Sequence, residues 1–447
     1  MQADKRRNAR KLASLNGDEG KIDQARSGAE SKPISFSSIH RRCKTNGSLN
    51  CYRAGASMLS RDCGRDLDEH SRVQRFESLL HRENVDMHAL RVLSWNGIPE
   101  KYRGLVWRML LEYCPPNALR REVVLSKKRE EYREFCLRYY VNMSTNTLRQ
   151  DWLESASYHD KIFVHQIKID VPRTLPHNSL FSDLRIQGAL ERVLTLWSLR
   201  HPASGYVQGI NDLVTPFFIV FLREFTIKNE KKDDQDKECY LEEEDKCISP
   251  AVQSSCTEKE ECCTRSTPKK NENLDIDFSL ISDQDLAIIE ADVYWSMSMF
   301  IQSIQDNYIF AQPGIRRMLK DLEKLVSRID APLFVHLQAE GINFVQFAFR
   351  WMNCLLMREL PMSIVIRLWD TYISEGRQFS SLHTYFCASL LISFSKELRE
   401  SDFQNLMMFL HHLPTEDWTI ESIEPLISQA YMWQTYYNNS PSHLKTL

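Results

Sequence analysis

The 447-residue sequence lacks the short motifs that mark the common nucleotide-binding and hydrolytic sites. It has no G-x-x-x-x-G-K-[ST] phosphate loop, no G-x-S-x-G elbow and no H-E-x-x-H pair. The first absence excludes nucleotide binding as a P-loop protein. The other two exclude the serine-hydrolase and zinc-protease chemistries that depend on those residues.

Long apolar runs, a strong net charge and paired cysteines are also missing. The most apolar run, 213–222, is interrupted by Thr215 and Pro216 and is too short to span a bilayer. The net charge of −3 gives no overall attraction to nucleic acid. None of the twelve cysteines forms a C-x-x-C pair, so the spacing disfavours a zinc site. A reduced, cytoplasmic protein is expected. No secretory leader is expected at the N-terminus.

What the sequence does contain is an apolar pattern with helical spacing from about residue 71 to 435. Helices are expected across 118–141, 145–166, 178–200 and 206–225. A loop is expected at 167–176, where Pro172 and Pro176 occur. No strand alternation and no fixed-period repeat occurs. The pattern predicts an all-α globule, followed by a C-terminal tail at 436–447.

Two polar segments differ from this helical region in composition. Residues 1–70 are basic and poor in large apolar residues, which predicts a disordered arm, or alternatively a docking segment for an acidic partner or membrane surface. Residues 226–285 are acidic, which predicts a disordered insertion within the helical domain.

Two short segments place charged or amide side chains beside glycine or proline. The first is 167–174, with Asp170 and Arg173, and the second is 205–212, with Gln208. Such loops are common sites of function. The spacing alone leaves open a structural alternative, in which Arg173 pairs with Asp170 on the surface and Gln208 caps a helix.

Together these segments resemble the two signature motifs of TBC domains, the Rab GTPase-activating module. The pattern I-x-x-D-x-x-R occurs as Ile167, Asp170 and Arg173, and Y-x-Q-G occurs as Tyr206, Gln208 and Gly209. Two further family motifs stand in the expected order. The first is G-I-P followed by R-x-x-x-W, which occurs as Gly97–Pro99 with Arg103 and Trp107. The second is R-x-W-D, which occurs as Arg367, Trp369 and Asp370. The resemblance covers about 95–376, and stretches at 305–314 and 347–352 resemble the member-22 branch of the family.

The resemblance implies a TBC fold of two helical subdomains within 71–435. It also implies a catalytic activator for a GTP-bound Rab GTPase, with Arg173 and Gln208 entering the partner's site as an arginine and a glutamine finger. The chain would need no cofactor of its own, because the partner carries GTP and Mg²⁺. Trp107 and Trp369 are expected in the core because an indole buries a large area.

Supporting roles follow for four other residues, partly with alternatives. Asp170 is expected either to orient the Arg173 guanidinium or its loop, or to cap a helix start. Arg103 supports the finger region by family analogy, or serves as a structural salt-bridge partner. Tyr206 belongs to the second motif, and Gly209 would let the backbone approach the partner closely because it lacks Cβ.

A different class of function is also open, namely a non-catalytic helical scaffold that binds a GTPase or another trafficking partner. Both interpretations expect no nucleic-acid partner and no transmembrane segment. They expect a cytoplasmic protein of vesicle trafficking, recruited peripherally to the Golgi or to another trafficking membrane. The intact Arg173 and Gln208 motifs favour the catalytic interpretation.

Overall fold

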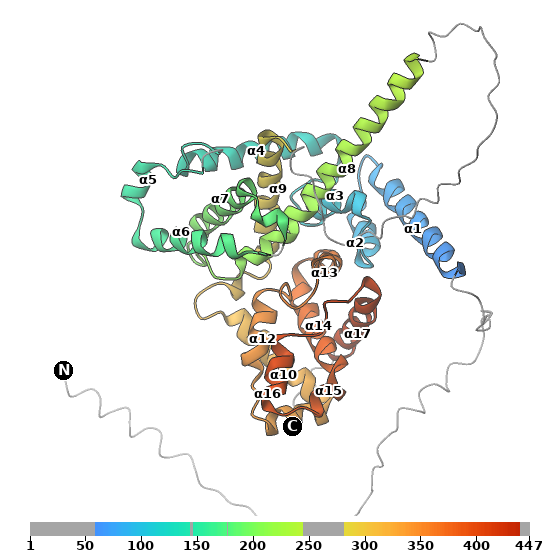
Figure 1. Ribbon diagram of the computed structural model, residues 1–447, viewed down its shortest axis with the longest axis vertical. Helices are drawn as coiled ribbons and strands as arrows, with labels where there is room; N and C mark the ends of the chain where they lie inside the picture. The colour runs from blue at the N-terminus through green and yellow to red at the C-terminus, as the bar shows by residue number, and fades with distance from the viewer. Residues whose placement is uncertain (1–58, 144–145, 177, 245–280, 439–447) are drawn as a thin grey trace, which may run out of the picture. The chain divides into compact units, whose positions relative to one another are not determined.

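The computed structural model describes residues 59–143, 146–176, 178–244 and 281–438 (Figure 1). The chain divides into two units, Met1–Asp62 and Cys63–Leu447, and nearly all described residues lie in the second. The described residues form helices and turns, with two isolated β-bridges and no strand, which confirms the all-α prediction. Most of the predicted arm, residues 245–280 of the insertion and residues 439–447 lie outside the described residues.

The first group of helices carries both predicted finger motifs (Figure 1). It comprises α1 (Leu59–Leu80), α2 (Met87–Trp95), α3 (Glu100–Leu110), α4 (Ala118–Tyr139), α5 (Gln150–Ser155), α6 (Tyr158–Asp170), η3 (Val171–Arg173), η4 (Ser179–Ser182), α7 (Leu184–Arg200), α8 (Ile210–Glu244) and α9 (Asp283–Gln302). Side-chain caps define several of these helix starts. Asp183, for example, accepts hydrogen bonds from the backbone N–H groups of Arg185 and Ile186.

The second group of helices packs around α10 and α14. It comprises η6 (Gln305–Asn307), α10 (Pro313–Ile329), α11 (Ala331–Ala339), α12 (Phe344–Asn353), α13 (Met362–Glu375), η7 (Gly376–Gln378), α14 (Phe379–Ser393), α15 (Ser395–Arg399), α16 (Phe403–His411) and α17 (Ile420–Asn438). Helix α13 contacts α2, α3 and α8, so it joins the two helical subdomains.

Aromatic side chains from both groups meet at this junction. Trp107, Phe217, Phe300 and Trp369 lie on α3, α8, α9 and α13, and at most 2% of any of them is exposed. The Phe300 and Trp369 rings stack with centroids 4.6 Å apart, and Phe217 meets Trp107 edge to face at 5.5 Å. The burial of Trp107 and Trp369 confirms their predicted place in the core.

Helix boundaries differ from the prediction in several places. The single helix predicted across 145–166 is wrong, because α5 ends at Ser155 and α6 begins at Tyr158, and the helices predicted from 178 and 206 begin at Leu184 and Ile210.

Helix α1 reaches back to Leu59 in the predicted arm, α8 continues to Glu244 in the predicted insertion, and α17 ends at Asn438. Residues 226–244 contain no glycine or proline and many lysines and glutamates, which favour helix despite their polarity. The predicted loop at 167–176 is wrong in its first part, because α6 runs through Asp170 and η3 follows directly.

Candidate functional site

Arg173 stands at the end of η3 with an exposed side chain. The backbone beneath it is fixed, because the buried Thr174 donates its hydroxyl to the Asp170 carbonyl at 3.0 Å and Pro172 restricts the turn. The Arg173 side chain makes no hydrogen bond or ion pair with any residue that the structure describes. A rigid turn therefore presents an unpaired guanidinium to solvent.

Gln208 lies in the connection between α7 and α8, and its side chain is also exposed. Its amide forms no hydrogen bond within the described part of the chain. The next residue, Gly209, has φ of 106°, and a Cβ there would lie 2.4 Å from Nδ2 of Asn353. Glycine is thus required by the backbone conformation and by a neighbour inside the domain. The close approach of this backbone to a partner stays a prediction.

Arg173 and Gln208 line the same groove, which has a volume of about 500 Å³. The other lining residues are Asp170, Leu175, Pro176, Asn211, Asp212, Met357 and Arg358. The fold therefore brings together two side chains that the sequence places in separate motifs. The structural alternative, with Arg173 paired to Asp170 and Gln208 capping a helix, is not observed.

Asp170 connects the two motifs beneath the groove. It is 5% exposed, and its Oδ2 lies 3.0 Å from the Tyr206 hydroxyl and 3.1 Å from Gln166 Nε2. Its side chain caps no helix and forms no hydrogen bond or ion pair with Arg173, so the capping role and direct orientation of the guanidinium are corrected. Orientation of the loop that carries Arg173 stays a prediction. Burial, and then the Asp170 charge, raise the pKa of Tyr206 well above its usual value, so the phenol remains a hydrogen-bond donor.

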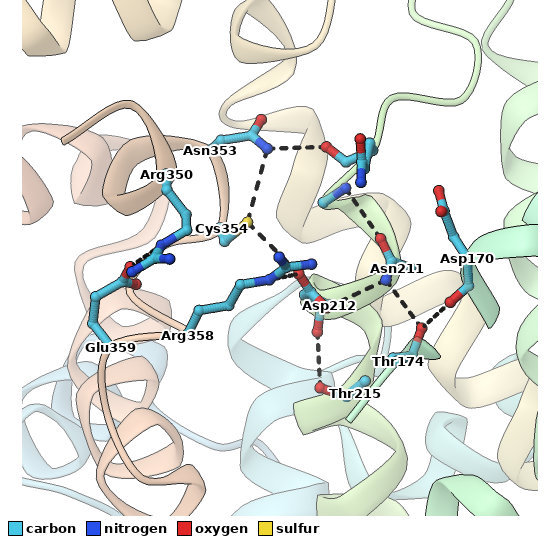
Figure 2. Close-up of polar contacts among 12 residues, drawn as sticks. Asp170, Thr174, Asn211, Asp212, Thr215, Arg350, Asn353, Cys354, Arg358 and Glu359 are labelled. Carbon is cyan, nitrogen blue, oxygen red and sulfur yellow. Dashed lines mark hydrogen bonds and ion pairs between the residues drawn. The ribbon is translucent and has the colours of Figure 1, made fainter. Parts of the chain in front are cut away.

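Asn211 extends this network into the start of α8 (Figure 2). Its Oδ1 accepts from the Gly209 N–H at 3.0 Å, and its Nδ2 donates to Thr174 Oγ1 at 3.0 Å. The segments that follow the two fingers are therefore hydrogen-bonded to each other. Pro216 leaves the Asp212 carbonyl without its helical donor, and Thr215 Oγ1 supplies a hydrogen bond at 2.8 Å instead.

The third side of the groove comes from the turn after α12, which the sequence analysis missed (Figure 2). Arg358 Nε donates to Asp212 Oδ2 at 2.8 Å, and Asn353 Nδ2 donates to the Gln208 carbonyl at 2.9 Å. Burial raises the pKa of Asp212, and the charge of Arg358 opposes that shift. Asn211 and Asp212 could have been suspected because they lie two and three positions after the Gly209 of Y-x-Q-G, but no local signal pointed to Asn353 or Arg358.

Arg103 lies elsewhere and does not line the groove. Its Nε lies 3.2 Å from both carboxylate oxygens of the fully buried Asp370, and its Nη2 donates to the Ile98 carbonyl at 2.6 Å. Trp107 Nε1 and the Ile98 N–H donate to the same carboxylate at 2.7 and 2.9 Å. The contacts favour the salt-bridge alternative, in which Asp370 joins the G-I-P, R-x-x-x-W and R-x-W-D motifs.

Among the described residues, no group of three or more His, Cys, Asp or Glu side chains is placed to hold a metal ion. No described helix is long and apolar enough to cross a membrane.

The helical fold and the joined motifs define a TBC-type domain. The Rab-GTPase-TBC domain family matches residues 100–251 and 278–399, and the chain belongs to this family. In the solved structure of the Ypt/Rab-GAP domain of Gyp1p, 98% of that chain corresponds to 82% of this one, with 40% identity and a TM-score of 0.67.

Curated relatives agree with this assignment. GTPase-activating protein gyp1 of Schizosaccharomyces pombe is 43% identical over 84% of this chain and 63% of its own length. TBC1 domain family member 22B of Homo sapiens is 42% identical over 84% of this chain and 64% of its own length. The chain thus spans less than two thirds of either relative, and the predicted member-22 branch is confirmed.

Proposed function

We propose that the chain is a GTPase-activating protein for a Rab-family GTPase in its GTP-bound form. The observation that carries the proposal is the shared groove, where the side chains of Arg173 and Gln208 are both exposed and form no hydrogen bond to any described residue. The related gyp1 of Schizosaccharomyces pombe is named as a GTPase-activating protein, which supports the same activity.

Arg173 is proposed to stabilise the charge that develops on the phosphoryl oxygens as the β–γ bond of GTP loosens. A guanidinium stays protonated and presents several N–H donors in one plane, which suits two phosphate oxygens at once. An arginine supplied in trans accelerates hydrolysis on the order of 10³- to 10⁵-fold in GTPases generally. Because Arg173 has no partner among the described residues, it breaks no such interaction when it enters the partner's site.

Gln208 is proposed to orient the attacking water. A carboxamide can accept a hydrogen bond from water while it donates one to a phosphate oxygen. The fixed backbone around Gln208 lowers the entropy lost when the side chain is ordered. GTP and Mg²⁺ belong to the partner in this proposal, and the chain contributes neither.

The partner also gives the proposed location. A Rab carried on a trafficking membrane would recruit the chain peripherally, and the Golgi is the compartment proposed first. Selection among Rabs would depend on shape and charge over a surface wider than the groove.

The proposal is tested by phosphate release from a panel of GTP-loaded Rabs with catalytic amounts of the chain. At least one Rab should be accelerated by the parent and hardly at all by Arg173→Ala or Gln208→Ala. The exposed Arg399 and Gln404 provide matched controls, and their alanine variants should retain full activity. Binding of a Rab with no acceleration by the parent would instead favour the scaffold alternative.

A further inference from the structure

The main chain of Gln208 is held by one side chain from the other helical subdomain. Asn353, the last residue of α12, is 7% exposed and donates from Nδ2 to the Gln208 carbonyl at 2.9 Å. The same amide fills the space that a Cβ on Gly209 would need. Asn353 therefore fixes both the position and the identity of the residues around the glutamine finger.

Asn353 is itself placed by an unusual turn (Figure 2). Leu355 and Leu356, both fully buried, have φ of 49° and 63°, a region that costs free energy for residues other than glycine. An ion pair of 2.5 Å between Arg350 Nε and Glu359 Oε1 spans the turn. Such a conformation persists only where the surrounding contacts impose it.

A second contact sets Asn353 from the opposite side. The hydroxyl of Tyr308, which is 1% exposed, donates to the Asn353 carbonyl at 2.8 Å. This bond reaches the Asn353 main chain, whereas the bond to Gln208 uses its side chain. The two interactions can therefore be removed separately.

We infer that Asn353 is a positioning residue for catalysis, which acts by holding Gln208 where its carboxamide can meet the attacking water. The inference rests on the proposed function and adds a residue from outside both finger motifs. Asn353 does not touch the partner in this scheme, and it is not among the residues that line the groove. Arg358 assists by pairing with Asp212 in the first turn of α8.

The informative variant is Asn353→Asp, which keeps the size of the side chain but replaces the donor with an oxygen facing the Gln208 carbonyl. We expect the maximal stimulated rate to fall about tenfold or more, because small misplacements of a catalytic group have large effects on rate. The Rab concentration at half-maximal rate should change less than about threefold, since an interaction used in the transition state affects turnover rather than binding. Tyr113→Phe is the matched control, because it removes a buried hydrogen bond of 2.8 Å to Asp292, away from Gln208 and the groove, and it should retain the parent rate.

A Gln208→Ala background separates positioning from general destabilisation. There Asn353→Asp should lower the residual rate less than about twofold, because residues that act as one unit are not additive. Equal losses in both backgrounds would overturn the inference. Equal rates for the parent and Gln208→Ala would refute the proposed function instead.

Hydrogen–deuterium exchange tests the positioning without any activity. Backbone amides of 205–212 should exchange faster in Asn353→Asp than in the parent or in Tyr113→Phe. Unchanged exchange in that segment would overturn the inference whatever the kinetics show.

Discussion

The Tyr206 hydroxyl lies 3.0 Å from Oδ2 of Asp170, so a buried hydrogen bond joins the arginine-finger motif to the glutamine-finger motif. The same hydroxyl lies 3.2 Å from Oδ1 of Asn211, which also accepts the Gly209 N–H. The aspartate of one motif and the tyrosine of the other are therefore hydrogen-bond partners. Their common effect is to fix the distance between two turns whose exposed side chains face one groove.

Tyr206→Phe should weaken that connection while keeping the ring packed. Loss of one buried hydrogen bond should lower the free energy of unfolding by about 1–2 kcal/mol and leave Asp170 less fully paired. The stimulated rate should fall several-fold with little change in Rab affinity. Denaturant unfolding and single-turnover hydrolysis measure the two effects.

Tyr158→Phe is the control for this experiment, because Tyr158 is 77% exposed. It should change neither quantity. Parent values for Tyr206→Phe in both assays would contradict the role given to the hydrogen bond.

Asp370→Asn tests the network that joins three of the motifs at the subdomain junction. Burial raises the pKa of Asp370, yet Arg103, Ile98 and Trp107 all favour its charged form. The variant leaves Arg103 without its carboxylate, and we expect the free energy of unfolding to fall by about 3–5 kcal/mol. Chemical denaturation at neutral pH measures this change.

The exposed ion pair between Lys101 and Glu77, 3.8 Å apart, offers a comparison, because Lys101 lies on α3 as Arg103 does. Lys101→Ala should lower the free energy of unfolding by less than about 1 kcal/mol, because water screens this pair. A similar cost for Asp370→Asn would show that the buried network contributes little to stability.

His383 should make the fold sensitive to mild acid. Burial lowers the pKa of its imidazole from 6.5 to about 4, while Tyr372 lies 2.8 Å from Nδ1 and the Trp351 carbonyl 3.1 Å from Nε2. The unfolded chain binds a proton below pH 6.5 and the folded chain only near pH 4. The contribution of neutral His383 to the free energy of unfolding is therefore fully present above pH 6.5. It is lost as the pH falls toward 4, by about 3 kcal/mol in total.

Unfolding free energies measured at pH 7, 6, 5 and 4 test this dependence. His383→Gln should lower stability at pH 7 but flatten the fall between pH 6 and 4. His159→Gln, at an exposed histidine, should keep the parent slope. The same slope in His383→Gln and the parent would contradict the assignment.

Local patterns predicted the parts of this protein that local chemistry decides. Helical periodicity predicted the all-α fold, and the two motifs pointed to Arg173 and Gln208, which the fold brings to one groove. The disordered insertion predicted from polarity is wrong for 226–244, because lysine and glutamate favour helix and α8 continues through this segment.

Contacts distant in sequence were out of reach. Asn353 and Gln208 are 145 positions apart, and Arg103 and Asp370 are 267 positions apart. Nothing in the spacing near either residue specifies its partner, because helix packing decides which segments meet. For the same reason the sequence offered only local roles for Asp170, with the Arg173 guanidinium, its loop or a helix start, whereas the fold pairs its side chain with Tyr206.

The most direct test compares binding of the chain to a cognate Rab loaded with GDP alone and with GDP plus aluminium fluoride, which mimics the transferred phosphoryl group. A catalytic arginine should strengthen binding to the fluoride complex on the order of 100-fold or more, because such groups favour the transition state over the ground state. Arg173→Ala should lose that gain, and Arg399→Ala should keep it. An undiminished gain with Arg173→Ala would contradict the assignment of Arg173 as the group that stabilises the transition state.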